Sequence, residues 1–173
     1  MVNDLLNTKA EPAINETQAW QALSQVLDPE VPVLSVLELG IVRSVSVAGG
    51  AVHVIVTPTY SGCPATEAIQ DALRAALLNA GASAVHVELK FTPAWTTDWI
   101  SPEAAEKLRR YGIAPPHSMS HSTQPLRFRP RDLHCPQCDS IRTERLSEFG
   151  STACKALYRC LACREPFDYF KPI

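Results

Sequence analysis

Two pairs of closely spaced cysteines near the C-terminal end most constrain how this chain folds. Cys135 and Cys138 form one C-x-x-C pair, and Cys160 and Cys163 form a second pair after 21 intervening residues. Four thiolates can complete a tetrahedral zinc shell, with each C-x-x-C turn supplying two ligands. A segment of about 40 residues is too short for a stable core without such a cross-link. We therefore predict a zinc ribbon held by these four cysteines, although tetrahedral sulfur also accommodates iron and a pair of redox dithiols is an alternative.

Composition and charge argue against several other classes of protein. The chain has 173 residues, of which 46% are apolar and 20% charged, so it can form a packed core. With 16 basic and 18 acidic residues, its net charge of −2 gives no reason to expect nucleic-acid binding through bulk positive charge. No apolar run approaches the roughly 20 residues that span a bilayer, and no signal peptide is recognisable. We expect a cytoplasmic protein without membrane contact, where paired cysteines bind metal more often than they form disulfides.

A proline-containing segment without apolar periodicity separates two regions of opposite charge. Four prolines fall within residues 114–132, which is typical of a linker. Residues 1–126 contain 7 basic and 12 acidic residues, a balance of −5, whereas residues 127–173 contain 9 and 6, a balance of +3. The predicted parts are a flexible tail at 1–13, a first domain at 14–113, a linker at 114–132 and the zinc ribbon at 133–173.

The first domain alternates between helical and strand patterns. In chain order, the predicted elements are a helix near 16–27, strands at 41–47 and 51–57, a helix from Pro64 to Gly81, a strand at 85–91 and a helix from Pro102 to Gly112. Ala48-Gly49-Gly50 indicates a hairpin between the first two strands. The strand–helix–strand segment over 51–91 predicts a crossover. The expected fold class is α+β or α/β, with a small mixed sheet covered by helices.

Cys63 is the one cysteine of the first domain. It follows a predicted strand and precedes Pro64, a residue favoured in the first turn of a helix. A helix N-terminus favours negative charge, and the thiolate is both the nucleophilic and the metal-binding form of cysteine. A small buried residue in a tight turn is an equally weighted interpretation. No histidine lies close in sequence, so the sequence does not support a hydrolytic Cys–His pair.

Several other residue positions leave alternatives open. Cys154 is either a buried or partly exposed thiol without a role at the metal, or a redox or cluster-transfer residue beside the ribbon metal. His117 and His121 lie in the predicted linker, where they are solvated or make a transient metal contact, and His134 could replace a ribbon ligand. Asp28 could cap a turn. Of Trp95 and Trp99, we expect one in the core, and the other lies either in the core or on a surface that binds a partner.

Longer stretches of sequence resemble known families. DPEVPVLSVLELGIV (28–42) followed by TPTYSGCPATE (57–67) resembles the iron–sulfur assembly domain of SufT-like and cytosolic iron–sulfur targeting factors. PAWTTDWISPEAAEKLRRYGIAPP (93–116) and SEFGSTACKALYRCLACREPFDYFK (147–171) resemble the PaaD family of phenylacetate catabolism, and the likeness covers most of residues 20–173. Glu38 is a departure, because many members have Asp there and the longer side chain changes the reach of its carboxylate.

The resemblance implies an accessory protein of the monooxygenase that epoxidises the ring of phenylacetyl-CoA, with oxygenase and ferredoxin-reductase chains as partners. The sequence agrees that the chain is not catalytic by itself. It contains no paired Glu-x-x-His motifs of a di-iron centre, no flavin or nicotinamide fingerprint and no plant-type ferredoxin spacing.

The resulting hypothesis is maturation of a partner's iron site. In it, Cys63 is a transient ligand for iron or an iron–sulfur cluster, Asp28, Thr57 and Thr59 shape its pocket, and the ribbon zinc is structural. The alternatives are a permanent docking or regulatory subunit, an electron carrier with an iron-loaded ribbon and, more weakly, a nucleic-acid-binding ribbon.

Overall fold

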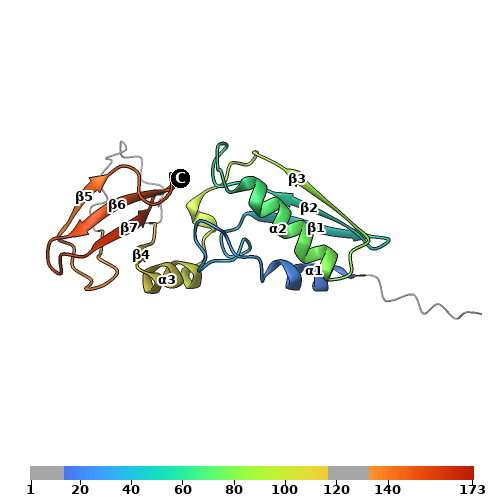
Figure 1. Ribbon diagram of the computed structural model, residues 1–173, viewed down its shortest axis with the longest axis horizontal. Coiled ribbons are helices and arrows are strands. Elements are labelled where there is room, and N and C mark those ends of the chain that lie inside the picture. Colours follow the sequence, from blue (N-terminus) through green and yellow to red (C-terminus); the bar gives the residue numbers. More distant parts are fainter. Residues whose placement is uncertain (1–13, 117–132) are drawn as a thin grey trace, which may run out of the picture.

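The first sheet has the mixed topology that the sequence predicts. The computed structural model describes residues 14–116 and 133–173. Its first sheet contains β1 (Val42–Ala48), β2 (Ala51–Val56) and β3 (Ala84–Leu89) in the order β1-β2-β3. β1 and β2 are antiparallel and joined by the predicted hairpin, whereas β2 and β3 are parallel and joined by a helical crossover (Figure 1). The predicted tail and most of the predicted linker, including His117 and His121, lie outside the described residues.

Two helices accompany this sheet. α1 (Glu16–Leu23) contacts β1 and α2, and α2 (Thr66–Asn79) packs against β3. Asn15 and Gln18 form the predicted capping box at the start of α1, through reciprocal hydrogen bonds of 2.9 Å. α1 ends at Leu23, earlier than expected, because the chain turns so that Val26 and Asp28 can pair with residues 34–36.

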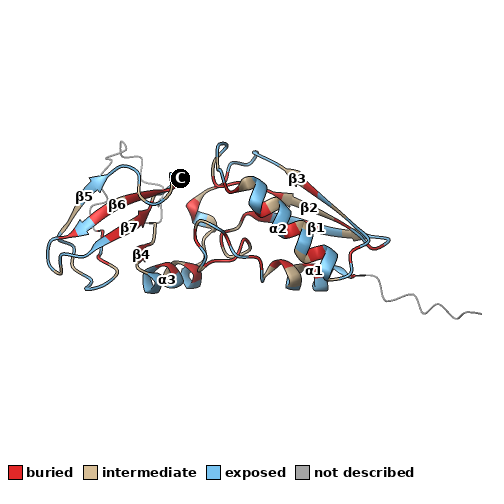
Figure 2. Ribbon diagram, viewed as in Figure 1, coloured by how far each residue is buried: buried red, intermediate tan, exposed pale blue. Residues whose placement is uncertain are grey.

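The second sheet includes a strand from the predicted end of the first domain. It contains β4 (Ile113–Ala114), β5 (Thr143–Ser147), β6 (Lys155–Cys160) and β7 (Pro166–Phe170) in the order β4-β7-β6-β5. β4 pairs in parallel with β7, so the predicted boundary at residue 114 falls inside a strand of the ribbon sheet. Strands β6 and β7 are largely buried, whereas β5 is mostly exposed (Figure 2).

The segment between the sheets contains the short 3-10 helix η1 (Thr97–Trp99) and α3 (Pro102–Tyr111). The hydroxyl of Ser101 caps α3 by accepting from the Ala104 N–H, and Gly112 ends it with a φ of 92° in the left-handed region. The two sheets lie at opposite ends of the elongated molecule, with η1 and α3 between them (Figure 1). No helix among residues 14–116 and 133–173 is long and apolar enough to cross a membrane.

The core of the first domain extends into the ribbon. Cys154 and Phe170 from the ribbon pack with it, and the rings of Phe170 and Trp95 have centroids 6.2 Å apart. Trp95 is buried and its indole N–H donates to the Leu39 carbonyl at 2.8 Å, which confirms the expectation of one core tryptophan. Trp99 is half-buried, and the guanidinium of Arg43 lies 3.5 Å from its ring centroid. The two sheets are therefore joined by packing as well as by the chain.

Candidate metal sites

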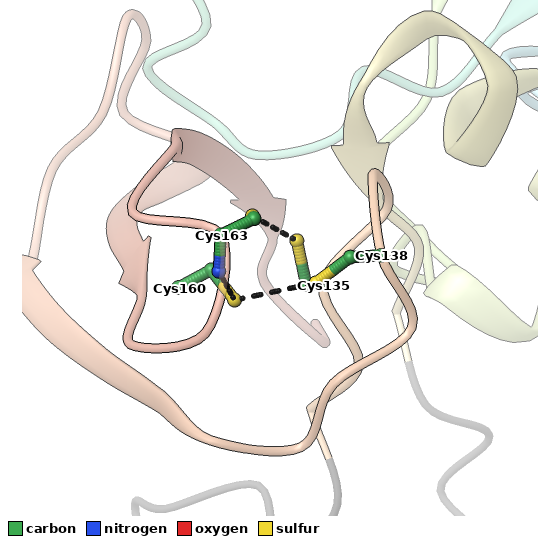
Figure 3. A group of neighbouring side chains, drawn as sticks. All are labelled: Cys135, Cys138, Cys160 and Cys163. Carbon is green, nitrogen blue, oxygen red and sulfur yellow. Dashed lines mark hydrogen bonds between the residues drawn. The ribbon is translucent and has the colours of Figure 1, made fainter.

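The four ribbon cysteines converge as their spacing predicts. Their sulfur atoms all lie within 4.8 Å of one another, with Sγ–Sγ distances of 3.7 Å between Cys135 and Cys163 and 3.6 Å between Cys138 and Cys160 (Figure 3). One pair precedes β5 and the other joins β6 to β7, so the group connects the two ends of the ribbon. Four convergent sulfurs fit a tetrahedral thiolate-bound metal. The chain thus contains a metal-binding group at these cysteines.

The two C-x-x-C turns have the same backbone geometry. The residues that follow them, Asp139 and Arg164, have φ angles of 60° and 72°, in the left-handed region that non-glycine residues seldom occupy. Their N–H groups donate to the carbonyls of Cys135 and Cys160 at 2.9 and 3.0 Å. The surrounding fold keeps Asp139 and Arg164 in this strained conformation. Such strain is expected where each turn has to direct two sulfur atoms toward the same point.

Backbone amides also stabilise negative charge on the ribbon sulfurs. The N–H groups of Ala162 and Cys163 lie 3.3 and 3.5 Å from Cys160 Sγ. Burial acts to raise the pKa of Cys160, but these N–H groups and the Cys138 thiol bring it down to about 6. His134 is not part of this group of convergent ligand atoms, and its ring Nδ1 contacts the Asp139 carboxylate at 3.0 Å.

Cys63 lies in the loop that leads from β2 into α2. Its side chain is half-buried and lines a small, mostly apolar pocket between the sheet and the helix. The other lining residues are Ile41, Val56, Pro58, Thr59, Thr66, Ile69 and Leu89. Of the predicted pocket residues, Thr59 lines this pocket with Cys63. Thr57 and Asp28 are buried but are not among the lining residues.

The charge state of Cys63 differs from the sequence-based expectation. Burial raises the pKa of this thiol and the charge of Glu30 raises it further, while the Ala65 N–H and the hydroxyls of Thr59 and Thr66 lower it. The expected lowering by a helix N-terminus is wrong, because α2 begins only at Thr66 and burial outweighs the nearby donors. Cys63 is therefore a neutral thiol near pH 7, and a metal has to displace its proton.

The acidic segment at 28–30 faces the ribbon. Asp28 is buried, and its Oδ1 accepts from the N–H groups of Glu30 and Val31, each at 2.8 Å, which confirms the turn-capping interpretation. The ammonium of Lys155 donates to the Glu30 carbonyl at 3.0 Å, and Cys154 Sγ lies 3.8 Å from Glu30 Oε2. Glu38 instead contacts Ser35 and the ammonium of Lys107 on α3.

Two protein families match the chain, one over the first domain and the other over the ribbon. Residues 16–91 match the family described as iron–sulfur cluster assembly protein, and residues 119–171 match the PaaD zinc beta ribbon domain. A protein of Escherichia coli (strain K12), provisionally named as one of the subunits of 1,2-phenylacetyl-CoA epoxidase, is 52% identical over 97% of this chain and 98% of its own length. The chain belongs to the PaaD family. This confirms the family that the sequence resembles.

More distant relatives of this PaaD family member cover a smaller share of the chain. An Fe-S protein maturation auxiliary factor of Porphyromonas gingivalis is 36% identical over 62% of this chain and 97% of its own length. A solved structure of a conserved hypothetical protein from Thermotoga maritima has a TM-score of 0.50 and 32% identity over 57% of this chain and 97% of its own. The chain thus combines an iron–sulfur cluster assembly domain with a PaaD zinc beta ribbon domain.

Three residues were not predicted as site residues from the sequence: Glu30, Lys155 and Tyr60, whose buried hydroxyl has no hydrogen-bond partner among the described residues. Glu30 and Tyr60 lie in the two stretches that resemble the iron–sulfur assembly domain. This resemblance is the sequence signal that could have identified them as site residues. Lys155 is only 3% exposed, and a single lysine in a strand pattern gives no indication that it is buried against a segment 125 residues earlier in the chain.

Proposed function

We propose that this PaaD family member is an accessory factor of phenylacetyl-CoA epoxidase that transfers iron or an iron–sulfur cluster to a partner subunit. The name of its Escherichia coli relative supports the enzyme system, and the name of its Porphyromonas gingivalis relative supports the maturation role. The observation that carries the proposal is a half-buried thiol, Cys63, beside a pocket and apart from the four-cysteine group. A carrier needs such a ligand, because it has to bind its cargo and also release it.

The ribbon has a structural role in this proposal, with zinc as its metal. Cys135, Cys138, Cys160 and Cys163 hold the ion, which supplies four strong bonds and no redox chemistry. Reduced thiols are required at this group and at Cys63, so we place the function in the cytoplasm.

Within the first domain, the loop around Cys63 determines how cargo is bound. The Cys63 proton leaves to solvent when the sulfur binds iron. The Ala65 N–H and the hydroxyls of Thr59 and Thr66 then stabilise the thiolate, since each lowers the pKa of Cys63. The raised pKa of the free thiol favours reprotonation, and hence release, once the partner's ligands compete for the iron.

An activity measurement in cells tests the role of Cys63. We expect a Cys63→Ala variant to remain folded and to lower both epoxidase activity and the iron content of the oxygenase, whereas Ser61→Ala, an exposed change in the same loop, has no effect. Wild-type activity together with wild-type iron loading in the Cys63→Ala strain would exclude Cys63 from the mechanism.

A permanent docking subunit is the second candidate function, because the ribbon exposes large apolar side chains. Ile141 and Phe149 are 60% and 63% exposed, and Leu146 and Leu161 are also exposed. Size-exclusion chromatography with purified oxygenase separates the two functions, because a stable stoichiometric complex favours docking and a transient one favours maturation. An absorption spectrum tests an electron-carrying ribbon, because zinc is colourless and iron thiolate is not.

A further inference from the structure

Cys154 belongs spatially to the first domain rather than to the ribbon metal group. It precedes β6, is only 4% exposed and packs with the core of the first domain, apart from the cluster that holds Cys135 and Cys160. Its Sγ lies 3.0 Å from the Thr152 hydroxyl and 3.8 Å from Glu30 Oε2. Two ligands of one tetrahedral ion, at about 2.3 Å for sulfur and about 2.0 Å for oxygen, lie at a similar separation from each other.

Cys63 packs against the same core cluster that contains Cys154. The negative charge of the Glu30 carboxylate raises the pKa of both Cys63 and Cys154, in addition to the larger effect of burial on each. The Glu30 carboxylate contacts the Cys154 sulfur and also acts electrostatically on Cys63, so it is linked to one sulfur from each part of the chain. Lys155 anchors this arrangement, because its ammonium is bound to the Glu30 carbonyl.

The Tyr60 hydroxyl is a further observation that indicates a ligand site near Cys63, Cys154 and Glu30. It is buried, and no described residue is its hydrogen-bond partner. Burial has the largest effect on the pKa of this phenol and raises it, and negative charge on Cys63, Glu30 or Cys154 raises it further. A buried hydroxyl without a partner is costly unless a ligand or its shell completes the hydrogen bonding.

We propose that Cys63, Cys154 and Glu30 form a single transient iron(II) site across the contact between the first domain and the ribbon. This inference rests on the proposed function and adds the ribbon as a contributor of ligands to the cargo. Two sulfurs and one carboxylate oxygen suit divalent iron, each thiol loses one proton to solvent as its bond to iron forms, and no electron is transferred. The Tyr60 hydroxyl gains a partner in the filled site.

Binding requires the side chains to close on the ion. Within the described residues, only the four ribbon cysteines bring three or more donor atoms within 4.8 Å of one another. The donors of the proposed site must therefore rotate inward. Because part of the binding free energy is spent on this closure, the site releases its ion more easily than the ribbon does.

Cobalt(II) added to the anaerobic, full-length protein tests this inference, with the ribbon first saturated with zinc. We expect the wild type to bind one further cobalt ion with a thiolate charge-transfer band. A Cys154→Ser variant should retain its fold by circular dichroism, bind this cobalt at least about tenfold more weakly and show a weaker band. Thr152→Val, which replaces the hydroxyl beside Cys154 with a methyl group, should bind cobalt as the wild type does.

A Glu30→Gln variant provides a second test that keeps the shape of the side chain. It should also weaken cobalt binding at least about tenfold while leaving the sulfur charge-transfer band of the saturated protein intact. If Cys154→Ser and Glu30→Gln bind cobalt like the wild type while Cys63→Ser does not, the composite site is wrong and the proposed role of Cys63 stands. If Cys63→Ser also binds like the wild type, the proposed function fails as well.

Discussion

At the residue scale, the proposed chemistry of the first domain depends on the surroundings of one sulfur. Cys63 is half-buried beside apolar side chains, and burial together with the Glu30 charge keeps it protonated near neutral pH. This suits a ligand that exchanges a proton for a metal, and it does not suit a nucleophile that has to be ionised at all times.

Alkylation of Cys63 by iodoacetamide should therefore depend steeply on pH. Because the pKa of Cys63 lies above its ordinary value of 9.0, the thiolate fraction and the rate should still be rising above pH 9. Mass spectrometry of the Cys63 peptide after timed quenching gives the rate, with free cysteine as the control. A rate that reaches its plateau below pH 8 would contradict the buried environment.

The sequence could predict the ribbon ligands but not the charge state of Cys63. The spacing of Cys135, Cys138, Cys160 and Cys163 is enough, because each C-x-x-C turn is local. The pKa of Cys63 depends on burial and on Glu30, which lies 33 residues earlier in the chain, and no local pattern contains that information. The contact between Cys154 and Glu30 could not be predicted from the sequence for the same reason.

At the element scale, the apolar spacing of α2 determines how the Cys63 loop is held. Ile69, Leu73 and Leu77 are buried at helical spacing against the sheet, and this spacing was sufficient to predict the helix. Its start was predicted two residues too early, at Pro64, because the chain first makes a turn in which the Thr66 hydroxyl binds the Cys63 carbonyl at 2.8 Å. The two-residue strand β4 is too short to leave any periodicity in the sequence.

A substitution within α2 tests this packing. Leu73 is fully buried, so Leu73→Ala should lower the free energy of unfolding by about 2–5 kcal/mol through lost burial and a cavity. Leu78→Ala, at a position 50% exposed on the same helix, should change it by less than about 1 kcal/mol. Urea denaturation of both variants checks the difference, and equal losses would contradict the assigned helix face.

At the scale of the whole molecule, the ribbon covers part of the first domain's core. Phe170 packs on Trp95, the Thr97 N–H donates to the carbonyl of Ile173 at 3.2 Å, and the buried Lys155 binds the Glu30 carbonyl. The sequence predicts two parts with opposite charge, and the structure contains two sheets that are in contact. Their contact could not be predicted, because it joins residues more than 70 positions apart.

Loss of the ribbon metal should therefore be detectable in the first domain. A Cys135→Ser variant should lose the folded ribbon, expose Trp95 and shift its fluorescence to longer wavelength, while the first sheet persists by circular dichroism. The same substitution in a Trp95→Phe background should remove the shift and serves as the control. A soluble Cys135→Ser protein with no bound metal and wild-type spectra would contradict a structural role for the metal.

The central claim is that Cys63 carries iron while the ribbon cysteines hold a separate structural metal. Anaerobic purification with quantification of zinc and iron, comparing the wild type with Cys63→Ser, tests it most directly. We predict that both proteins retain the ribbon metal and that only the wild type binds additional iron. Equal iron content in the two proteins would contradict the account.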